Sequence, residues 1–324
     1  MRDSLAASLV LDTLPGRWVT LFRVLATLTR GRRTVPELPE RVMSVPVVSI
    51  GDAWLNRYCE VCGFESGRST LPVLLPQLLG FPLVLHYFAS AHFPWSALGV
   101  VHLGNAIEAS RALEAGEVFS LSLRTGALSS HPKGQAFSLT VALAQDGREV
   151  WRATQTLLRL GVNEPVGPRW DEAAALGQRG DEDEAAALGQ RGIADEAVSS
   201  WPSVPAFDRV GSFDAPADIG RRYAPVSGDF NPIHLSRWSA RWLGFDRSIA
   251  HGMWSLARTL AVLGVDRIDG PHRLQTVFGS PVRLPARVTV WAARVDGALA
   301  FEVRDQEGDR VHLRGRLLDQ WSPS

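Results

Sequence analysis

The stretch YAPVSGDFNPIHLSRWSARWLGF, residues 223–245, carries more structural information than any other part of this 324-residue sequence. Asn231 followed by Pro232 predicts the start of a helix, because asparagine accepts backbone hydrogen bonds at the N-cap and proline suits the first helical position. We expect this helix to run to about Leu243 and to end at Gly244.

Two chemically active side chains meet at the start of this helix. His234 lies in its first turn and Asp229 lies just outside it. The partial positive charge of a helix amino terminus favours a neutral imidazole and an ionised carboxylate. The following segment SIAHGM, residues 248–253, predicts a second helix start at His251 and Gly252. Its unpaired N–H groups and its glycine would suit an oxyanion hole.

The second helix is followed by strands. Apolar residues of Met253–Leu263 recur at helical spacing on one face. Further on, the alternation of apolar and polar residues over Arg310–Leu317 is typical of a strand with one wet face. The pairs Asp296-Gly297 and Glu307-Gly308 predict hairpin turns between such strands.

The first half of the chain repeats this order of elements. An apolar segment near Leu71–Ala89 precedes strand-like runs at Glu117–Arg124, Gln135–Gln145 and Arg148–Leu160, with an Asp146-Gly147 turn before the last. Each half therefore predicts an α+β layer in which an antiparallel sheet wraps one apolar helix, and several such arrangements fit the pattern. The segment Tyr58–Phe64 aligns with Tyr223–Phe230 but lacks the aspartate and the following histidine, so we expect no chemistry in the first half.

The chain divides into four segments. The linker is rich in Ala, Gly and charge, and it contains DEAAALGQRG twice, at 171–180 and 183–192. The amino-terminal segment carries charges among its apolar residues, which predicts an amphipathic helix. The predicted segments are an amino-terminal helical segment (1–34), a degenerate first repeat (35–162), the linker (163–203) and a catalytic second repeat (204–324).

Composition excludes several classes of protein. The 34 basic and 34 acidic residues give zero net charge, which disfavours a nucleic-acid binder. Two cysteines favour a reducing cytoplasm over a disulfide scaffold. Prolines interrupt the longest apolar stretches, so we expect no membrane span. No group of His, Cys and carboxylate has metal-ligand spacing, and we expect no metal and no cofactor.

The motif Y-x-x-x-S-G-D-x-N-P-I-H, followed by Gly244-Phe245 and I-A-H-G-M, resembles that of the MaoC-like (R)-specific enoyl-CoA hydratases and (3R)-hydroxyacyl-thioester dehydratases, in their two-repeat form. This resemblance implies an α+β double hot-dog fold, in which the first repeat shapes the acyl pocket. The implied reaction is the reversible syn addition of water to a trans-2-enoyl thioester. The implied partner is an acyl-CoA or acyl-carrier-protein thioester, and a homodimer of such chains is compatible with it.

The resemblance also implies residue roles. Asp229 and His234 would be the catalytic pair, and the Gly252 N–H would polarise the thioester carbonyl. Supporting or substrate-binding roles would fall to Asn231, Ser227 and His251. Which of the catalytic pair takes the proton stays open, because coupled groups titrate together.

Two other functions compete with a dehydratase. The chain could be a catalytically weak acyl-binding subunit, although packing alone does not require the set of Asp229, Asn231, His234 and Gly252. An acyl thioesterase ranks lower, because such enzymes usually rely on a carboxylate without this motif. For the phosphates of a carrier group, Arg283 or Arg287 is a candidate contact. Trp238, Trp242 and Trp254 could either wall the pocket or only fill space there, and we expect the filling role.

Overall fold

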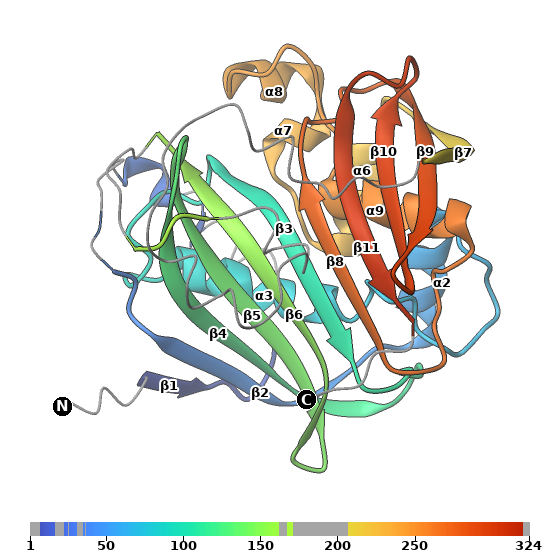
Figure 1. Ribbon diagram of the computed structural model, residues 1–324. Coiled ribbons are helices and arrows are strands. Elements are labelled where there is room, and N and C mark those ends of the chain that lie inside the picture. The colour runs from blue at the N-terminus through green and yellow to red at the C-terminus, as the bar shows by residue number, and fades with distance from the viewer. Residues whose placement is uncertain are drawn as a thin grey trace.

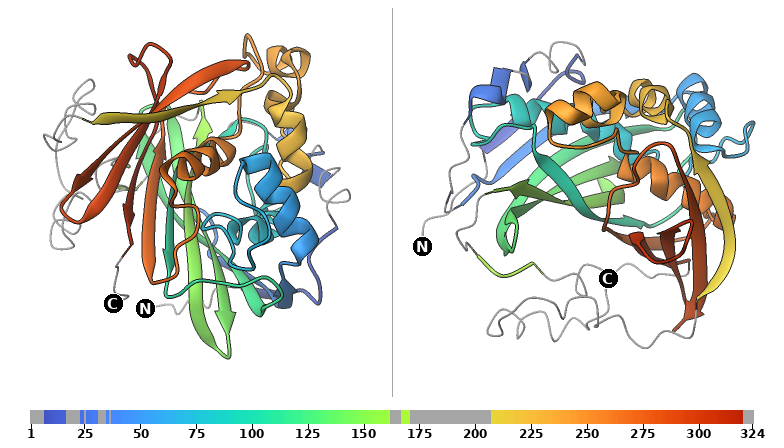
Figure 2. Two further views of the ribbon diagram at one scale, coloured as in Figure 1. Left: turned by 90° about the vertical axis from the view of Figure 1, so that its right-hand side faces the viewer. Right: turned by 90° about the horizontal axis from the view of Figure 1, so that it is seen from above.

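The computed structural model describes residues 7–16, 23–24, 26–30, 35, 37–161, 167–170 and 207–319. Within these residues it is a mixed fold in which one curved sheet has helices on its concave side (Figures 1 and 2). The strands are β1 (Ala7–Val10), β2 (Arg41–Ser49), β3 (Val100–Ala109), β4 (Val118–His131), β5 (Gly134–Gln145), β6 (Arg148–Leu160), β7 (Asp208–Ala215), β8 (His272–Phe278), β9 (Ala286–Val295), β10 (Ala298–Asp305) and β11 (Val311–Leu318). The helices are η1 (Thr27–Thr29), α2 (Asp52–Cys62), α3 (Gln77–Ala89), α6 (Ile219–Ser227), α7 (Pro232–Leu235), α8 (Arg237–Trp242) and α9 (Gly252–Leu263).

The strand order shows one fold used twice. After the edge strand β1, the order is β2-β4-β5-β6-β3, and then β8-β11-β10-β9-β7. The two halves have the same strand order when each is read from its outer edge toward the middle of the sheet. In the middle, β3 of the first half pairs with β8 of the second over Gly104–Ala109 and His272–Val277. The long apolar helices α3 and α9 occupy corresponding places in the two halves (Figure 1). The predicted α+β repeat of one helix and one antiparallel sheet is therefore confirmed.

Local turn chemistry explains why the hairpins form where the sequence predicts them. Asp146 and Gly147 join β5 to β6 with φ values of 52° and 75°, and Asp296 and Gly297 join β9 to β10 with 49° and 75°. Two consecutive positive φ values are the signature of the type I′ turn, which Asp-Gly favours and whose twist matches that of paired strands. These two predicted turns are confirmed, and the predicted turn at Glu307-Gly308 lies between β10 and β11, with a positive φ of 90° at Gly308.

Helix α3 lies close to the sheet because one of its residues is a glycine. A Cβ placed on Gly80 of α3 would lie 2.5 Å from the methyl groups of Val141 on β5. Only a glycine lets this helix approach the strand so closely, because any side chain would displace the helix or the valine. The first repeat therefore has its apolar helix pressed onto its own sheet, as in the predicted layer.

Two predictions at the start of the chain and in the linker need correction or lie outside the described residues. Ala7–Val10 form the strand β1 instead of part of a helix, and they pair in parallel with β2 at Arg41–Ser44. This pairing gives their backbone N–H and C=O groups partners that a surface helix would have provided internally. In the predicted linker, only Gly167–Trp170 are described, so the duplicated segment lies outside the description. The predicted segment boundaries, after residues 34, 162 and 203, fall on or beside residues that the structure does not describe, so they stay predictions.

The predicted helix after Asn231 is two short helices. Asn231 does cap α7, since its Oδ1 accepts from the Ile233 N–H at 3.4 Å. Ser236 then adopts an extended backbone (φ −157°, ψ 159°), and its Oγ accepts from the Ser239 N–H at 3.1 Å. A serine that caps a new helix competes with continuing the old one, so the prediction of one continuous helix is wrong at this residue. Among the described residues, no helix is long and apolar enough to cross a membrane.

Candidate active site

A tight loop after α6 fixes the orientation of Asp229. The helix ends at Gly228 in the left-handed region (φ 81°). The Asp229 N–H then donates to Ser227 Oγ at 3.2 Å, and the Asn231 N–H donates to Asp229 Oδ1 at 3.0 Å. Ser227 and Asn231 therefore hold the aspartate from both sides, which leaves Oδ2 directed toward the neighbouring histidines.

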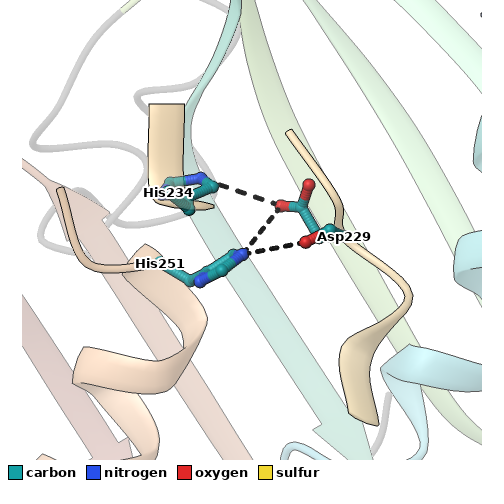
Figure 3. A group of neighbouring side chains, drawn as sticks. All are labelled: Asp229, His234 and His251. Atoms are coloured by element: carbon teal, nitrogen blue, oxygen red, sulfur yellow. Dashed lines mark hydrogen bonds and ion pairs between the residues drawn. The ribbon is translucent and has the colours of Figure 1, made fainter. Parts of the chain in front are cut away.

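Two histidines face this carboxylate oxygen (Figure 3). Asp229 Oδ2 lies 3.9 Å from His234 Nε2 and 3.9 Å from His251 Nε2, and the two imidazole rings stack with centroids 3.7 Å apart. At 3.9 Å neither contact is a direct hydrogen bond, but a single oxygen atom bound between Oδ2 and His234 Nε2 could contact both.

Hydrogen bonds to carbonyl groups assign the ring protons. His234 Nδ1 lies 2.9 Å from the Ile249 carbonyl oxygen, and His251 Nε2 lies 3.0 Å from the Asp229 carbonyl oxygen. A carbonyl can only accept, so each of these nitrogens carries the proton. In its neutral form His234 therefore presents the Nε2 lone pair to the space beside Asp229.

Burial keeps both rings neutral. It lowers the pKa of His234 from its ordinary value, against a smaller opposing effect of the Asp229 charge. Burial, followed by the adjacent His234, lowers the pKa of His251 to about 3. The neutral His234 expected from the sequence agrees with this direction, but the cause differs. The sequence pattern indicates a helix amino terminus as the cause, whereas α7 has a single turn and desolvation of the buried ring is the larger effect.

The same three side chains raise the question of a metal. The candidate ligand atoms of Asp229, His234 and His251 lie within 4.8 Å of one another, a grouping that sequence spacing did not reveal. However, His251 Nε2 donates its proton to the Asp229 carbonyl and so has no lone pair for a metal. Of the three side chains, only His234 Nε2 and the Asp229 carboxylate can then serve as ligands here. Such a donor set suits proton transfer better than a closed metal site.

Gly252 lies beside this cluster at the start of α9, directly after His251. The first N–H groups of a helix have no partner within it, and Gly252 is the first residue of this one. A Cβ on Gly252 would lie 2.9 Å from the ring of Phe278. The glycine is therefore required for space, and it lines the cavity with an N–H that has no partner within α9.

All six predicted site residues line one cavity of about 1310 Å³. Its wall includes a large apolar contribution from helix α3 of the first repeat: Leu78, Phe81, Val84, Leu85 and Phe88. His102 on β3 also lines it, and its ring contacts the Phe278 ring in a tilted arrangement with centroids 4.8 Å apart. From the sequence, His102 could line the acyl pocket or simply pack in the core, and the structure places it in the cavity wall, where the pairing of β3 with β8 across the two repeats puts it.

The cations near the cavity differ from those expected. Lys133 and Arg310 line it, whereas Arg283 and Arg287 do not appear in its wall. Arg287 instead pairs with Asp214 at 3.2 Å on the far side of the second repeat. Arg283 or Arg287 as the phosphate contact therefore stays a prediction, and any such contact would lie outside the cavity wall. The expectation about tryptophans is wrong at two residues, because Trp238 and Trp242 are 73% and 92% exposed.

Comparison with known proteins places these residues in a recognised domain. Residues 206–315 match the model of the MaoC-like domain. The chain is 28% identical over 280 residues to 3-hydroxyacyl-thioester dehydratase X of Mycobacterium tuberculosis, covering 86% of this chain and 89% of that protein. It is 42% identical over 108 residues to 3-hydroxybutyryl-CoA dehydratase of Methylorubrum extorquens, covering 30% and 66%. The crystal structure of HtdX from M. tuberculosis superposes with a TM-score of 0.67 at 24% identity, covering 86% of this chain and 99% of that one.

Proposed function

We propose that this chain, which belongs to the MaoC-like family through residues 206–315, is a hydro-lyase that interconverts trans-2-enoyl and (3R)-3-hydroxyacyl thioesters. One observation carries the proposal. The Asp229 carboxylate and the His234 lone pair face each other across 3.9 Å in an apolar cavity, beside the N–H of Gly252. Hydration needs a base, a proton donor and a group that stabilises the enolate, and these three supply them.

The proton balance follows from this arrangement. In hydration, one of Asp229 and His234 takes a proton from a water bound between them while the water oxygen adds to C3 of the enoyl chain. The same proton is then delivered to C2, so the enzyme ends in its starting state. Because Asp229 and His234 are neighbours, both would act from one side of a bound chain, and the addition would be syn. The pair shares the proton, and the proposal does not assign its first acceptor.

Gly252 would act on the other end of the reacting unit. Negative charge gathers on the thioester oxygen as the C3–O bond forms, and the Gly252 N–H lies at the start of a 12-residue helix. A backbone donor so placed stabilises that charge without reorganising during the reaction. His251 would support this step indirectly, since it stacks on His234 and bonds the Asp229 carbonyl.

The carrier group is the finer part of the proposal. The relatives are named for hydroxyacyl-thioester and hydroxybutyryl-CoA dehydration, and we extend that substrate class to CoA or acyl-carrier-protein thioesters here. Both carriers have a phosphate-bearing arm, which Lys133 and Arg310 at the cavity wall could contact. A cytoplasmic location fits the two free cysteines, and a homodimer remains a prediction.

An assay of the purified chain alone distinguishes the competing functions. With crotonyl-CoA, the proposal predicts loss of the absorbance of the conjugated thioester and formation of 3-hydroxybutyryl-CoA. If the chain is an acyl-binding subunit, it will bind short and long enoyl chains without turnover. If it is a thioesterase, it will release free CoA thiol from a saturated acyl-CoA. Either of these results in place of hydration would refute the proposal.

A further inference from the structure

Three polar side chains form a row across the seam between the two repeats. Asn105 on β3 lies directly opposite Gln155 on β6, and it also lies directly opposite Thr276 on β8. Directly opposed residues on neighbouring antiparallel strands point to the same face of the sheet. Gln155, Asn105 and Thr276 therefore stand side by side on one face, and we call them the seam row.

The seam row lies on the face covered by α3. The Asn105 Nδ2 donates to Oε1 of Gln77, the first residue of α3, at 2.8 Å. All four side chains are strongly buried, with exposed fractions of 7% for Gln155, 5% for Gln77, 4% for Asn105 and 1% for Thr276. Polar groups at such depth are normally all hydrogen-bonded.

Two atoms of this group have no protein partner. Within the part of the chain that the structure describes, Asn105 Oδ1 and Thr276 Oγ1 are buried without a hydrogen bond. Gln77 and Gln155 line the cavity, where their neighbours are mostly apolar, such as Leu78 and Leu157. A hydrocarbon chain bound along this wall would offer no partner to the Gln155 amide or to the Gln77 Nε2 group, since Asn105 bonds only Gln77 Oε1, and this is unfavourable.

The seam row also lies near the reacting groups. Thr276 is two residues before Phe278 on β8, and the Phe278 ring lies against Gly252 and His102. Two strand residues span about 6.6 Å. The distance from Phe278 to Thr276 along β8 therefore matches a few carbon atoms of an extended acyl chain. The substituent would be carried that many carbons beyond the thioester carbonyl.

We propose that Gln77 and Gln155, backed by Asn105 and Thr276, form a subsite for an oxygen substituent, a hydroxyl or a ketone, carried by the acyl chain a few carbons beyond the reacting double bond. The amides of Gln77 and Gln155 can each donate and accept, so either substituent can pair with them. A site built to hydrogen-bond such a group discriminates against the unsubstituted chain much more strongly than an apolar pocket discriminates between chain lengths. This inference rests on the proposed function, because it names the substrate class of the same cavity.

The test compares matched pairs of trans-2-enoyl-CoA substrates with six, eight and ten chain carbons, one of each pair having a hydroxyl in place of a hydrogen at a defined carbon. We expect the hydroxylated member to have a kcat/KM at least about tenfold higher at one position, in line with one good hydrogen bond. The variants Gln155→Leu and Gln77→Met should remove that preference. Thr154→Val is the matched control, because Thr154 neighbours Gln155 on the opposite face of β6 and should preserve it.

The same pairs are measured by calorimetric binding to Asp229→Asn, so that the result does not depend on turnover. A tighter Kd for one hydroxylated chain, lost in Gln155→Leu or in Gln77→Met, supports the subsite. Equal Kd and kcat/KM within every pair overturns it. Failure of the proposed function gives a different result, since crotonyl-CoA would then not be hydrated by the unmodified protein at all.

Discussion

At the scale of single residues, the chemistry depends on the four-residue loop 228–231 between α6 and α7. The Asp229 N–H donates to Ser227 Oγ and the Asn231 N–H donates to Asp229 Oδ1, and together these bonds turn Asp229 Oδ2 toward His234. The motif in the sequence predicts which residues gather here. It could not predict that His251 stacks on His234, because that contact needs the amino terminus of α9 to lie against α7.

The catalytic pair gives the first prediction. Asp229→Asn and His234→Gln should each lower kcat for crotonyl-CoA by at least about 10²-fold, because each removes a positioned acid–base group. Steady-state kinetics and circular dichroism of the purified variants check the effect and the fold. Asp246→Asn is the control, an exposed aspartate in the same segment that should keep full activity. Turnover near that of the control in both variants would remove the pair from the mechanism.

Gly252 gives the second prediction. Gly252→Ala should lower kcat by about 10²–10³-fold, because the new methyl group would meet the Phe278 ring at 2.9 Å and displace the N–H from the thioester oxygen. Gly270→Ala is the control, because a Cβ at Gly270 would meet open space. Gly264→Ala is unsuitable, because Gly264 has a positive φ that alanine rarely adopts. A Gly252→Ala enzyme with unchanged kcat would show that this N–H does not stabilise the transition state.

At the scale of elements, tryptophans tie the two repeats together in a reciprocal way. Trp54 Nε1 on α2 donates to the Val226 carbonyl at 3.0 Å, and Trp254 Nε1 on α9 donates to the Val61 carbonyl at 3.0 Å. The acceptors Val61 and Val226 occupy matching positions in the aligned segments at the ends of α2 and α6. Each repeat therefore anchors a helix of the other.

The buried anchor gives the third prediction. Trp254→Phe should lower the free energy of unfolding by about 1–3 kcal/mol, because it leaves the Val61 carbonyl without its partner and removes ring area from the core. Urea denaturation measures this. Trp242→Phe, at a side chain that is 92% exposed, should change the free energy by less than about 0.5 kcal/mol. Equal effects in the two variants would contradict the anchoring role.

Elements with local signals were predictable from the sequence, and those set by distant partners were not. The Asp146-Gly147 and Asp296-Gly297 turns need positive φ, which those residue pairs favour directly. By contrast, β1 is a strand because it meets β2, more than 30 residues away, in parallel. The break at Ser236 is a local capping event, but a serine inside a helical pattern does not by itself reveal an extended backbone.

At the scale of the whole molecule, the seam between β3 and β8 makes one body of two repeats. The reactive groups come from the second repeat, and α3 of the first supplies a large apolar part of the cavity wall. The sequence predicted two repeats and an acyl pocket shaped by the first. It could not place Asn105, Gln155 and Thr276 in one row, because that requires the register of three strands from both halves.

Buried histidines give the fourth prediction, on stability against pH. Burial lowers the pKa of His102 to about 4 and of His251 to about 3, and it also lowers the pKa of His234 and His272. Below about pH 6.5 these histidines take up protons in the unfolded chain but stay neutral in the folded chain. The free energy of unfolding therefore falls as the pH falls below about 6.5. The urea midpoint should therefore be lower at about pH 5 than at about pH 7.5, and an equal or higher midpoint would contradict this.

The central claim is that Asp229 and His234 act together on one face of the substrate, and the stereochemistry of hydration in D₂O tests it most directly. Crotonyl-CoA is hydrated to low conversion by the unmodified protein, and the 3-hydroxybutyryl product is examined by NMR for the relative positions of the C2 deuterium and the C3 hydroxyl. The account predicts one diastereomer, from addition of both groups to the same face, with (3R) configuration. An anti product, or a mixture of C2 diastereomers at low conversion, would contradict it.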